Sequence, residues 1–70
     1  MKLVQTPITG TLRGYSVKAG DTIDIGQEIA IVESMKMLIP ILAETSGTVR
    51  ALSKRVDELI HEGETLIELE

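Results

Sequence analysis

The chain has 70 residues, a net charge of −4, no cysteine and a single aromatic residue, Tyr15. This length allows one small domain near the lower limit for a self-supporting core, and we expect residues 1–70 to form it. Without cysteine there is neither a disulfide framework nor a cysteine metal site, so aliphatic packing must stabilise the fold. The acidic balance argues against nucleic-acid binding, which uses basic patches and aromatic platforms.

No segment has the length or composition of a membrane or export signal. The longest nearly apolar stretch, Met37–Ala43, is too short to span a bilayer and is interrupted by Pro40. The first residues, Met1–Pro7, lack the extended apolar region and the cleavage site of a secretory signal. The sequence therefore predicts a cytoplasmic protein that does not bind membranes.

Short strands separated by turns occupy most of the chain. Alternating or continuous apolar residues predict the strands, and Gly, Pro and Asp mark the turns between them. The predicted strands are Leu3–Gln5, Gly10–Val17, Thr22–Ile25, Glu28–Glu33, Leu38–Leu42, Thr48–Ser53 and Glu64–Glu70. A slip in the alternation at Gly14 predicts a bulge or bend, and Pro40 places its strand at a sheet edge or where the N–H is not needed. Strands at this spacing are typical of an all-β sandwich or barrel.

Two segments of 27 residues, Pro7–Glu33 and Glu44–Glu70, repeat one pattern at an offset of 37 residues. The aligned identities are Gly10/Gly47, Thr11/Thr48, Arg13/Arg50, Ser16/Ser53, Ile23/Ile60, Gly26/Gly63 and Glu33/Glu70. The ten residues between the halves, Ser34–Ala43, have no aligned counterpart. Two similar halves predict a pseudo-two-fold axis, with Ser34–Ala43 at one end of the molecule and the termini near the other.

The segment Leu52–Ile60 supports two interpretations. Its apolar residues fall at helical spacing, which locally predicts a short helix. Its aligned counterpart, Tyr15–Ile23, contains Gly20 and a turn. Because two halves that share a core should share a fold, we predict a turn and a strand in Leu52–Ile60.

Lys36 lies between Met35 and Met37 in the segment without a counterpart. By composition alone it is a solvated charge, and the methionines are adaptable filler. The segment Glu33-Ser34-Met35-Lys36-Met37, however, resembles the E-[AS]-M-K-M attachment motif of biotinyl domains, the biotin carboxyl carrier family. This resemblance makes Lys36 the candidate for covalent attachment of a prosthetic group.

The resemblance covers nearly the whole chain. Four further segments resemble the family's A-P-M-P-G opening, V-K-x-G-D-x-V turn, G-x-V and E-G-x-x-L motifs: Thr6–Gly10, Val17–Ile23, Gly47–Val49 and Glu62–Leu66. The resemblance implies a flattened β-barrel, or hammerhead barrel-sandwich hybrid, of two four-stranded antiparallel sheets. Lys36 would then sit in a tight hairpin turn between strands Glu28–Ser34 and Met37–Ala43. One departure is Asp57, which occupies the place of the family's second turn glycine but tolerates left-handed backbone geometry better than most residues.

The resemblance implies a carrier rather than an enzyme. Biotin protein ligase would join biotin to Lys36, and the arm would shuttle a carboxyl group between a biotin carboxylase and a carboxyltransferase. Glu33, Ser34, Met35 and Met37 are expected to contact the ligase or other partners, and cover for the hairpin is the alternative for the two methionines. We expect a monomer. At this length the chain resembles free-standing biotin/lipoyl attachment proteins, and a carrier domain taken from a larger carboxylase is the alternative.

Two other hypotheses stay open. Lipoyl domains share the fold and usually carry Asp before the lysine, as in E-x-D-K, where this chain has Met35. Biotin is therefore favoured, with lipoate or dual modification as the first alternative and an unmodified β-sandwich docking module as the second.

His61 is a lone histidine, which cannot supply the convergent ligands of a metal site. Lys2, Lys18 and Lys54 lack the motif and are expected to be ordinary surface lysines.

Overall fold

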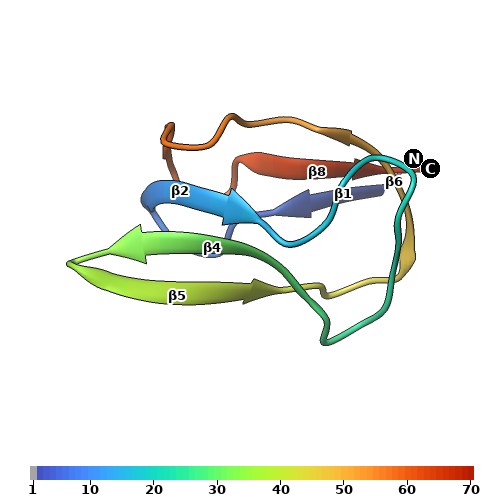
Figure 1. Cartoon of the computed structure of the whole chain (residues 1–70), viewed down its shortest axis with the longest axis horizontal. Coiled ribbons are helices and arrows are strands. Elements are labelled where there is room, and N and C mark those ends of the chain that lie inside the picture. The colour runs from blue at the N-terminus through green and yellow to red at the C-terminus, as the bar shows by residue number, and fades with distance from the viewer. Residues whose placement is uncertain (1) are drawn as a thin grey trace.

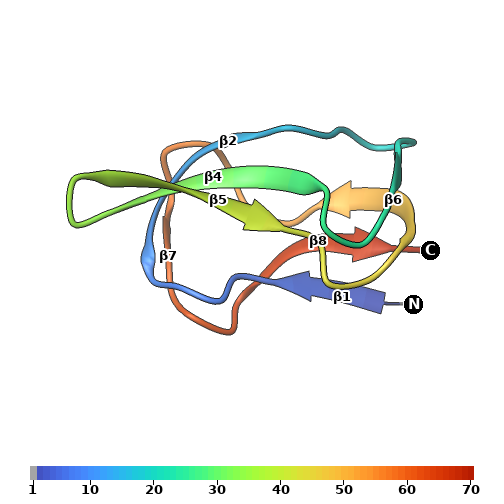
Figure 2. The ribbon, with the colours of Figure 1, turned by 90° about the horizontal axis from the view of Figure 1, so that it is seen from below.

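A computed structural model describes residues 2–70 and shows two four-stranded antiparallel sheets (Figures 1 and 2). Met1, which the predicted domain includes, lies outside the described residues. The strands are β1 (Lys2–Gln5), β2 (Gly10–Tyr15), β3 (Thr22–Ile23), β4 (Glu28–Ser34), β5 (Met37–Leu42), β6 (Gly47–Leu52), β7 (Leu59–Ile60) and β8 (Thr65–Leu69). One sheet has the order β1-β8-β6-β3 and the other β5-β4-β2-β7. The predicted fold class is confirmed. Within residues 2–70, no helix is long and apolar enough to cross a membrane.

The two sheets are built from equivalent strand pairs. β2 pairs with β4 and β7 in the same registers in which β6 pairs with β8 and β3, 37 residues along the chain. β1 and β5 are equivalent as well. Val4 in β1 pairs with Ile67, and the equivalent residues, Ile41 in β5 and Ala30 in β4, also pair. The repeat therefore extends into Ser34–Ala43, where the sequence alignment showed no counterpart.

The β4–β5 turn and the chain ends lie at opposite ends of the molecule (Figure 1). Lys2 pairs with Leu69, so β1 starts beside the end of β8. The β4–β5 turn joins two strands whose equivalents, β8 and β1, are not joined in the other half. The turn of the predicted segment Ser34–Ala43 lies at the end opposite the termini, as expected, while its later residues in β5 run back along β4.

The core consists of aliphatic side chains from both sheets. It contains Val4, Leu12, Val17, Ile23, Ile29, Ala30, Val32, Ile41, Ala43, Val49, Ile60, Leu66, Ile67 and Leu69. Burying one such large aliphatic side chain contributes about 1.5–3 kcal/mol. Thr6 is also buried, and its hydroxyl is satisfied locally by donating to the Ile8 carbonyl at 2.7 Å.

Bulges adjust which side chains reach the core. The β2–β4 register shifts between Leu12 and Gly14, which confirms the predicted bulge. In the β4–β5 ladder the register shifts between Glu28 and Ala30, so the successive residues Ile29 and Ala30 are both buried. A bulge inserts an extra residue and turns it relative to the partner strand, which breaks strict alternation.

The prediction that the third strand reaches Ile25 is wrong. β3 ends at Ile23, and Ile25 is 72% exposed. The Asp24 amide donates to the side-chain oxygen of Gln27 at 3.0 Å, and Gly26 has a φ of 88°. These contacts form a turn, which ends the strand despite the apolar side chain that follows.

The repeat correctly predicted the ambiguous segment. Leu52–Ile60 forms the end of β6, a turn and β7, and contains no helix. Val56 and Leu59, which suggested a helical face, are more than half exposed, whereas Ile60 is buried. Pro40 lies in β5, an edge strand, as predicted.

Candidate functional site

Met35 and Lys36 form a two-residue turn between β4 and β5. Ser34 faces Met37 in the last pair of the ladder, and the two turn residues have φ values of 54° and 66°. A turn with positive φ at both positions matches the twist of a hairpin but favours Asn and Gly. Because neither residue is Asn or Gly, the long flanking ladder must hold this backbone in place. Strained backbone of this kind is concentrated at functional sites.

The side chains around the turn are apolar and exposed. Met35 is 91% exposed, Met37 66% and Leu38 65%. Methionine is flexible and polarizable, so it adapts to different partner surfaces. Met35 therefore contributes almost no cover to the protein, and its side chain is available for contact with another molecule.

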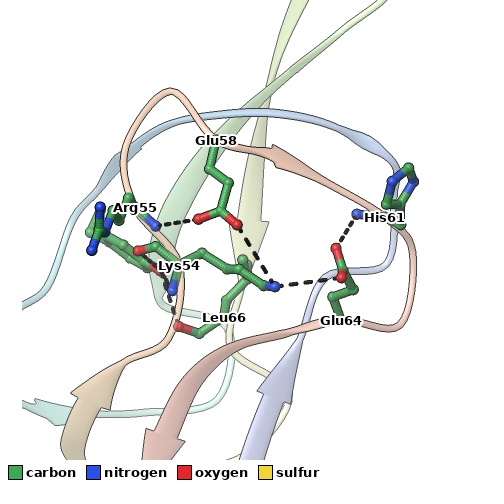
Figure 3. Close-up of polar contacts among 7 residues, drawn as sticks. Lys54, Arg55, Glu58, His61, Glu64 and Leu66 are labelled. Carbon is green, nitrogen blue, oxygen red and sulfur yellow. Dashed lines mark hydrogen bonds and ion pairs between the residues drawn. The ribbon is translucent and has the colours of Figure 1, made fainter.

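The lysines differ in the contacts of their amines. The Lys54 amine lies 3.4 Å from a Glu64 carboxylate oxygen (Figure 3), and that of Lys2 donates to the Ser46 carbonyl at 3.0 Å. Within residues 2–70, no hydrogen bond or ion pair involves the amines of Lys36 or Lys18. The Lys36 amine is therefore free of these polar contacts, and the residue also lies at the tip of the hairpin between β4 and β5.

Glu33 is held by an arginine from the adjacent strand. Arg13 donates through Nε to Glu33 Oε1 at 2.7 Å and through Nη1 to Asp57 Oδ1 at 2.9 Å. Both hydrogen bonds raise the pKa of Arg13 above its ordinary value, and the bond to Glu33 has the larger effect. Neither Arg13 nor Asp57 was predicted to belong to the site. The available clue was the replacement of a turn glycine by Asp57.

The turn that follows β7, from His61 to Glu64, is stabilised by the Glu64 side chain (Figure 3). Glu64 accepts a hydrogen bond from the His61 amide at 2.6 Å, and this bond, with the nearby Lys54, lowers the pKa of Glu64. His61 is exposed. Among residues 2–70, no group of three or more His, Cys, Asp or Glu side chains could hold a metal ion. The hydrogen bond from the His61 amide to Glu64 stabilises the turn.

Comparison with known proteins identifies the family. The family model described as "Biotin-requiring enzyme", which covers biotin and lipoyl attachment, matches residues 2–69. The biotin/lipoyl attachment protein of Bacillus subtilis (strain 168) is 48% identical over 66 residues, which is 94% of this chain and 90% of that protein. The chain belongs to the biotin/lipoyl attachment family, whose domains carry a group and are not catalysts by themselves.

A carboxylase subunit also contains a related domain. The mitochondrial propionyl-CoA carboxylase alpha chain of Homo sapiens is 37% identical over 68 residues, or 97% of this chain. The chain spans only 9% of that protein. The protein is thus homologous to a domain of a biotin-requiring family that includes carboxylases.

Solved structures support the fold. The Kluyveromyces lactis urea carboxylase matches with a TM-score of 0.87 and 22% identity, over 97% of this chain and 6% of that one. The lipoyl domain of the Azotobacter vinelandii 2-oxoglutarate dehydrogenase complex matches with a TM-score of 0.76 and 22% identity, over 100% of this chain and 96% of that one. Part of a carboxylase and a lipoyl domain therefore share this fold.

Proposed function

We propose that the protein is a biotin carboxyl carrier to which biotin is attached through the Lys36 amine. The observation that carries the proposal is the position of Lys36. It is at the tip of a two-residue hairpin turn, without a polar partner in residues 2–70, inside a segment that resembles the family's attachment motif. The matches to an attachment protein and to a carboxylase subunit support the same proposal.

The attachment reaction needs an accessible, neutral amine. Biotin protein ligase supplies biotin as an acyl-adenylate, whose acyl carbon the Lys36 nitrogen attacks. The new C–N bond replaces the C–O bond to AMP, which leaves with the electron pair, and the amine loses a proton to a base. The product is an uncharged amide. A turn held by its flanking ladder keeps the anchor in place while the long arm moves.

In this proposal the loaded domain passes between two enzymes. A biotin carboxylase adds a carboxyl group to the ureido nitrogen of the attached biotin, and a carboxyltransferase transfers it to an acceptor. The domain supplies the mount, and the exposed Met35, Met37 and Leu38 supply an adaptable surface around the arm. Glu33 and Ser34 complete the segment that the ligase and the partner enzymes recognise.

Lipoate is the second candidate. The Bacillus subtilis relative is named for both biotin and lipoyl attachment, which favours a shared or dual role. Biotin is preferred because Met35 stands where the resemblance places Asp in lipoyl domains. Met35→Asp should therefore lower biotinylation and leave the fold intact, because the side chain is 91% exposed.

Intact mass spectrometry tests the proposal. The chain is expressed with a biotin protein ligase and excess biotin, beside variants Lys36→Arg and Lys18→Arg. We expect one biotinyl group on the wild type and on Lys18→Arg, and none on Lys36→Arg. Residual biotin on Lys36→Arg would contradict the site. Protein purified from its native host then separates biotin, a lipoyl group and no adduct, and the last result would support the docking-module hypothesis.

A further inference from the structure

Asp57 occupies a backbone position that normally requires glycine. Its φ is 74°, whereas the equivalent residue of the first half, Gly20, has a φ of 97°. Both amides donate to equivalent carbonyls, Asp57 to Leu12 at 2.6 Å and Gly20 to Val49 at 2.8 Å. Left-handed backbone is unfavourable for residues with a Cβ. Since glycine suffices in one turn, the closure of the other turn does not explain Asp57.

The Asp57 side chain has one function visible in the structure, the ion pair with Arg13. It is 71% exposed, so it fills no space in the core. Its carboxylate holds Nη1 of Arg13, whose Nε holds Glu33. Gly20 has no side chain and cannot supply the equivalent carboxylate. The two halves therefore differ at this point, although their registers agree.

This difference coincides with the two ends of the molecule. β7, just after Asp57, pairs with β2 at Thr11, which faces Glu33 on its other side. Glu33 lies two residues before the attachment turn. The Gly20 turn instead lies beside β6, at the end where the chain termini meet (Figures 1 and 2). The extra carboxylate is found at the attachment end.

We propose that Arg13 and Asp57 are positioning residues that hold the Glu33 carboxylate for recognition by the modifying ligase; this rests on the proposed function. A guanidinium engaged on two sides has one orientation, and it fixes the carboxylate that it binds. Glu33 is the carboxylate nearest to Lys36 in sequence, and within residues 2–70 its ion pair is with Arg13 and not with Lys36. The ligase then meets an ordered Glu33 and an unpaired amine.

If Arg13 and Asp57 served only to stabilise the fold, the substitutions would lower the stability together with the activity. Exposed ion pairs contribute little to stability, and replacing Asp57 by glycine relieves the left-handed backbone. Asp57→Gly should therefore leave the urea midpoint equal or higher. A change in acceptor kinetics without loss of stability then identifies positioning.

The experiment measures KM and kcat of purified biotin protein ligase for the full chain, with urea midpoints for every variant. Asp57→Gly and Arg13→Ala should raise KM for the carrier about two- to fivefold, the range expected from losing one exposed ion pair, with kcat unchanged. Arg13→Lys should resemble Arg13→Ala, because an ammonium cannot bind both carboxylates as the planar fork does.

Two variants complete the design. Asp57→Asn keeps the left-handed tolerance and an acceptor oxygen but loses the charge, so its KM should lie between those of wild type and Asp57→Gly. Asp24→Asn removes the same charge from an exposed residue of the Asp24–Gln27 turn and should match the wild type.

Unchanged KM in both Asp57→Gly and Arg13→Ala would overturn the positioning proposal, as would a fall in midpoint that parallels the loss of activity. Failure of the wild type to be modified at Lys36 would instead overturn the proposed function.

Discussion

The missing side chain of Gly10 allows β2 to lie directly against the backbone of Glu33. A Cβ on Gly10 would be 2.4 Å from the Glu33 carbonyl oxygen and 2.8 Å from Val32 Cγ1. The first distance is to backbone, which cannot turn aside as a side chain can. Gly10 therefore fixes how β2 packs at the base of the β4–β5 hairpin.

Gly10→Ala should lower the free energy of unfolding by about 1–3 kcal/mol, because β2 and β4 must move apart or distort. Urea unfolding followed by circular dichroism measures the change. Gly14→Ala is the matched control in the same strand, since a Cβ there meets no atom within 4 Å. Its effect should stay below about 1 kcal/mol in either direction. Equal destabilisation by both variants would show that the contact with Glu33 has no particular role.

Met35 gives a second prediction, because its stability effect depends on the backbone alone. With a φ of 54° and 91% exposure, the residue has no packing to lose. Met35→Asn should raise the free energy of unfolding by up to about 1 kcal/mol, since Asn accepts left-handed geometry. Met35→Val should lower it by about 1–2 kcal/mol, since a β-branched residue accepts it poorly.

The same Met35 variants test recognition. If Met35 contacts the ligase, Met35→Asn should be biotinylated more slowly than the wild type while being at least as stable. Measuring the rate of biotin incorporation beside the urea midpoint separates the two effects. A rate equal to that of the wild type would assign recognition to other residues of the hairpin.

The sequence predicted the fold because its two halves share a core pattern and because the attachment motif is specific. It missed the equivalence of β1 and β5, since these strands share burial rather than residue identity. Val4 and Ile41 are both buried, as are Thr6 and Ala43, yet none of these pairs is identical. Alignment of residues does not detect such a match.

Other features depend on contacts between distant segments. The ion pairs of Arg13 join residues 13, 33 and 57, which no local pattern relates. The end of β3 before Ile25 depends on a hydrogen bond from the Asp24 amide to the Gln27 side-chain oxygen, which the apolar pattern does not reveal. The Lys36 turn was expected from the resemblance to the attachment motif, because Met35 and Lys36 lack the local preference of Asn and Gly for positive φ.

Tyr15 links the two halves through its hydroxyl group. The oxygen lies 2.9 Å from the Lys54 carbonyl and 3.0 Å from the Leu66 carbonyl, and it accepts a hydrogen bond from the Lys54 amide at 3.2 Å. Tyr15→Phe leaves these backbone groups without the hydroxyl and should cost about 1–2 kcal/mol of stability. Urea unfolding at neutral pH measures this loss.

The pH dependence of this difference is a further test. Burial raises the pKa of Tyr15 above its ordinary value of about 10. The unfolded chain therefore ionises first, so the contribution of Tyr15 is complete below about pH 10 and is lost as the pH rises through the folded pKa. The stability difference between wild type and Tyr15→Phe should narrow above about pH 10. A constant difference would contradict this origin of the pKa shift.

The stabilising contribution of Glu64 should be lost at low pH, whereas that of Tyr15 is lost at high pH. The His61 amide, followed by the Lys54 amine, lowers the pKa of the Glu64 carboxyl, so the folded state favours the charged form (Figure 3). Its contribution is present above the unfolded value of about 4.3 and is lost as the pH falls through the folded pKa. Glu64→Gln should therefore be less stable than the wild type at neutral pH and should lose less stability on acidification. Glu62→Gln removes an exposed carboxylate from the same turn and should follow the wild-type profile within about 0.5 kcal/mol. If Glu62→Gln and Glu64→Gln gave the same profile, the hydrogen bond to His61 would not be the source of the acid sensitivity.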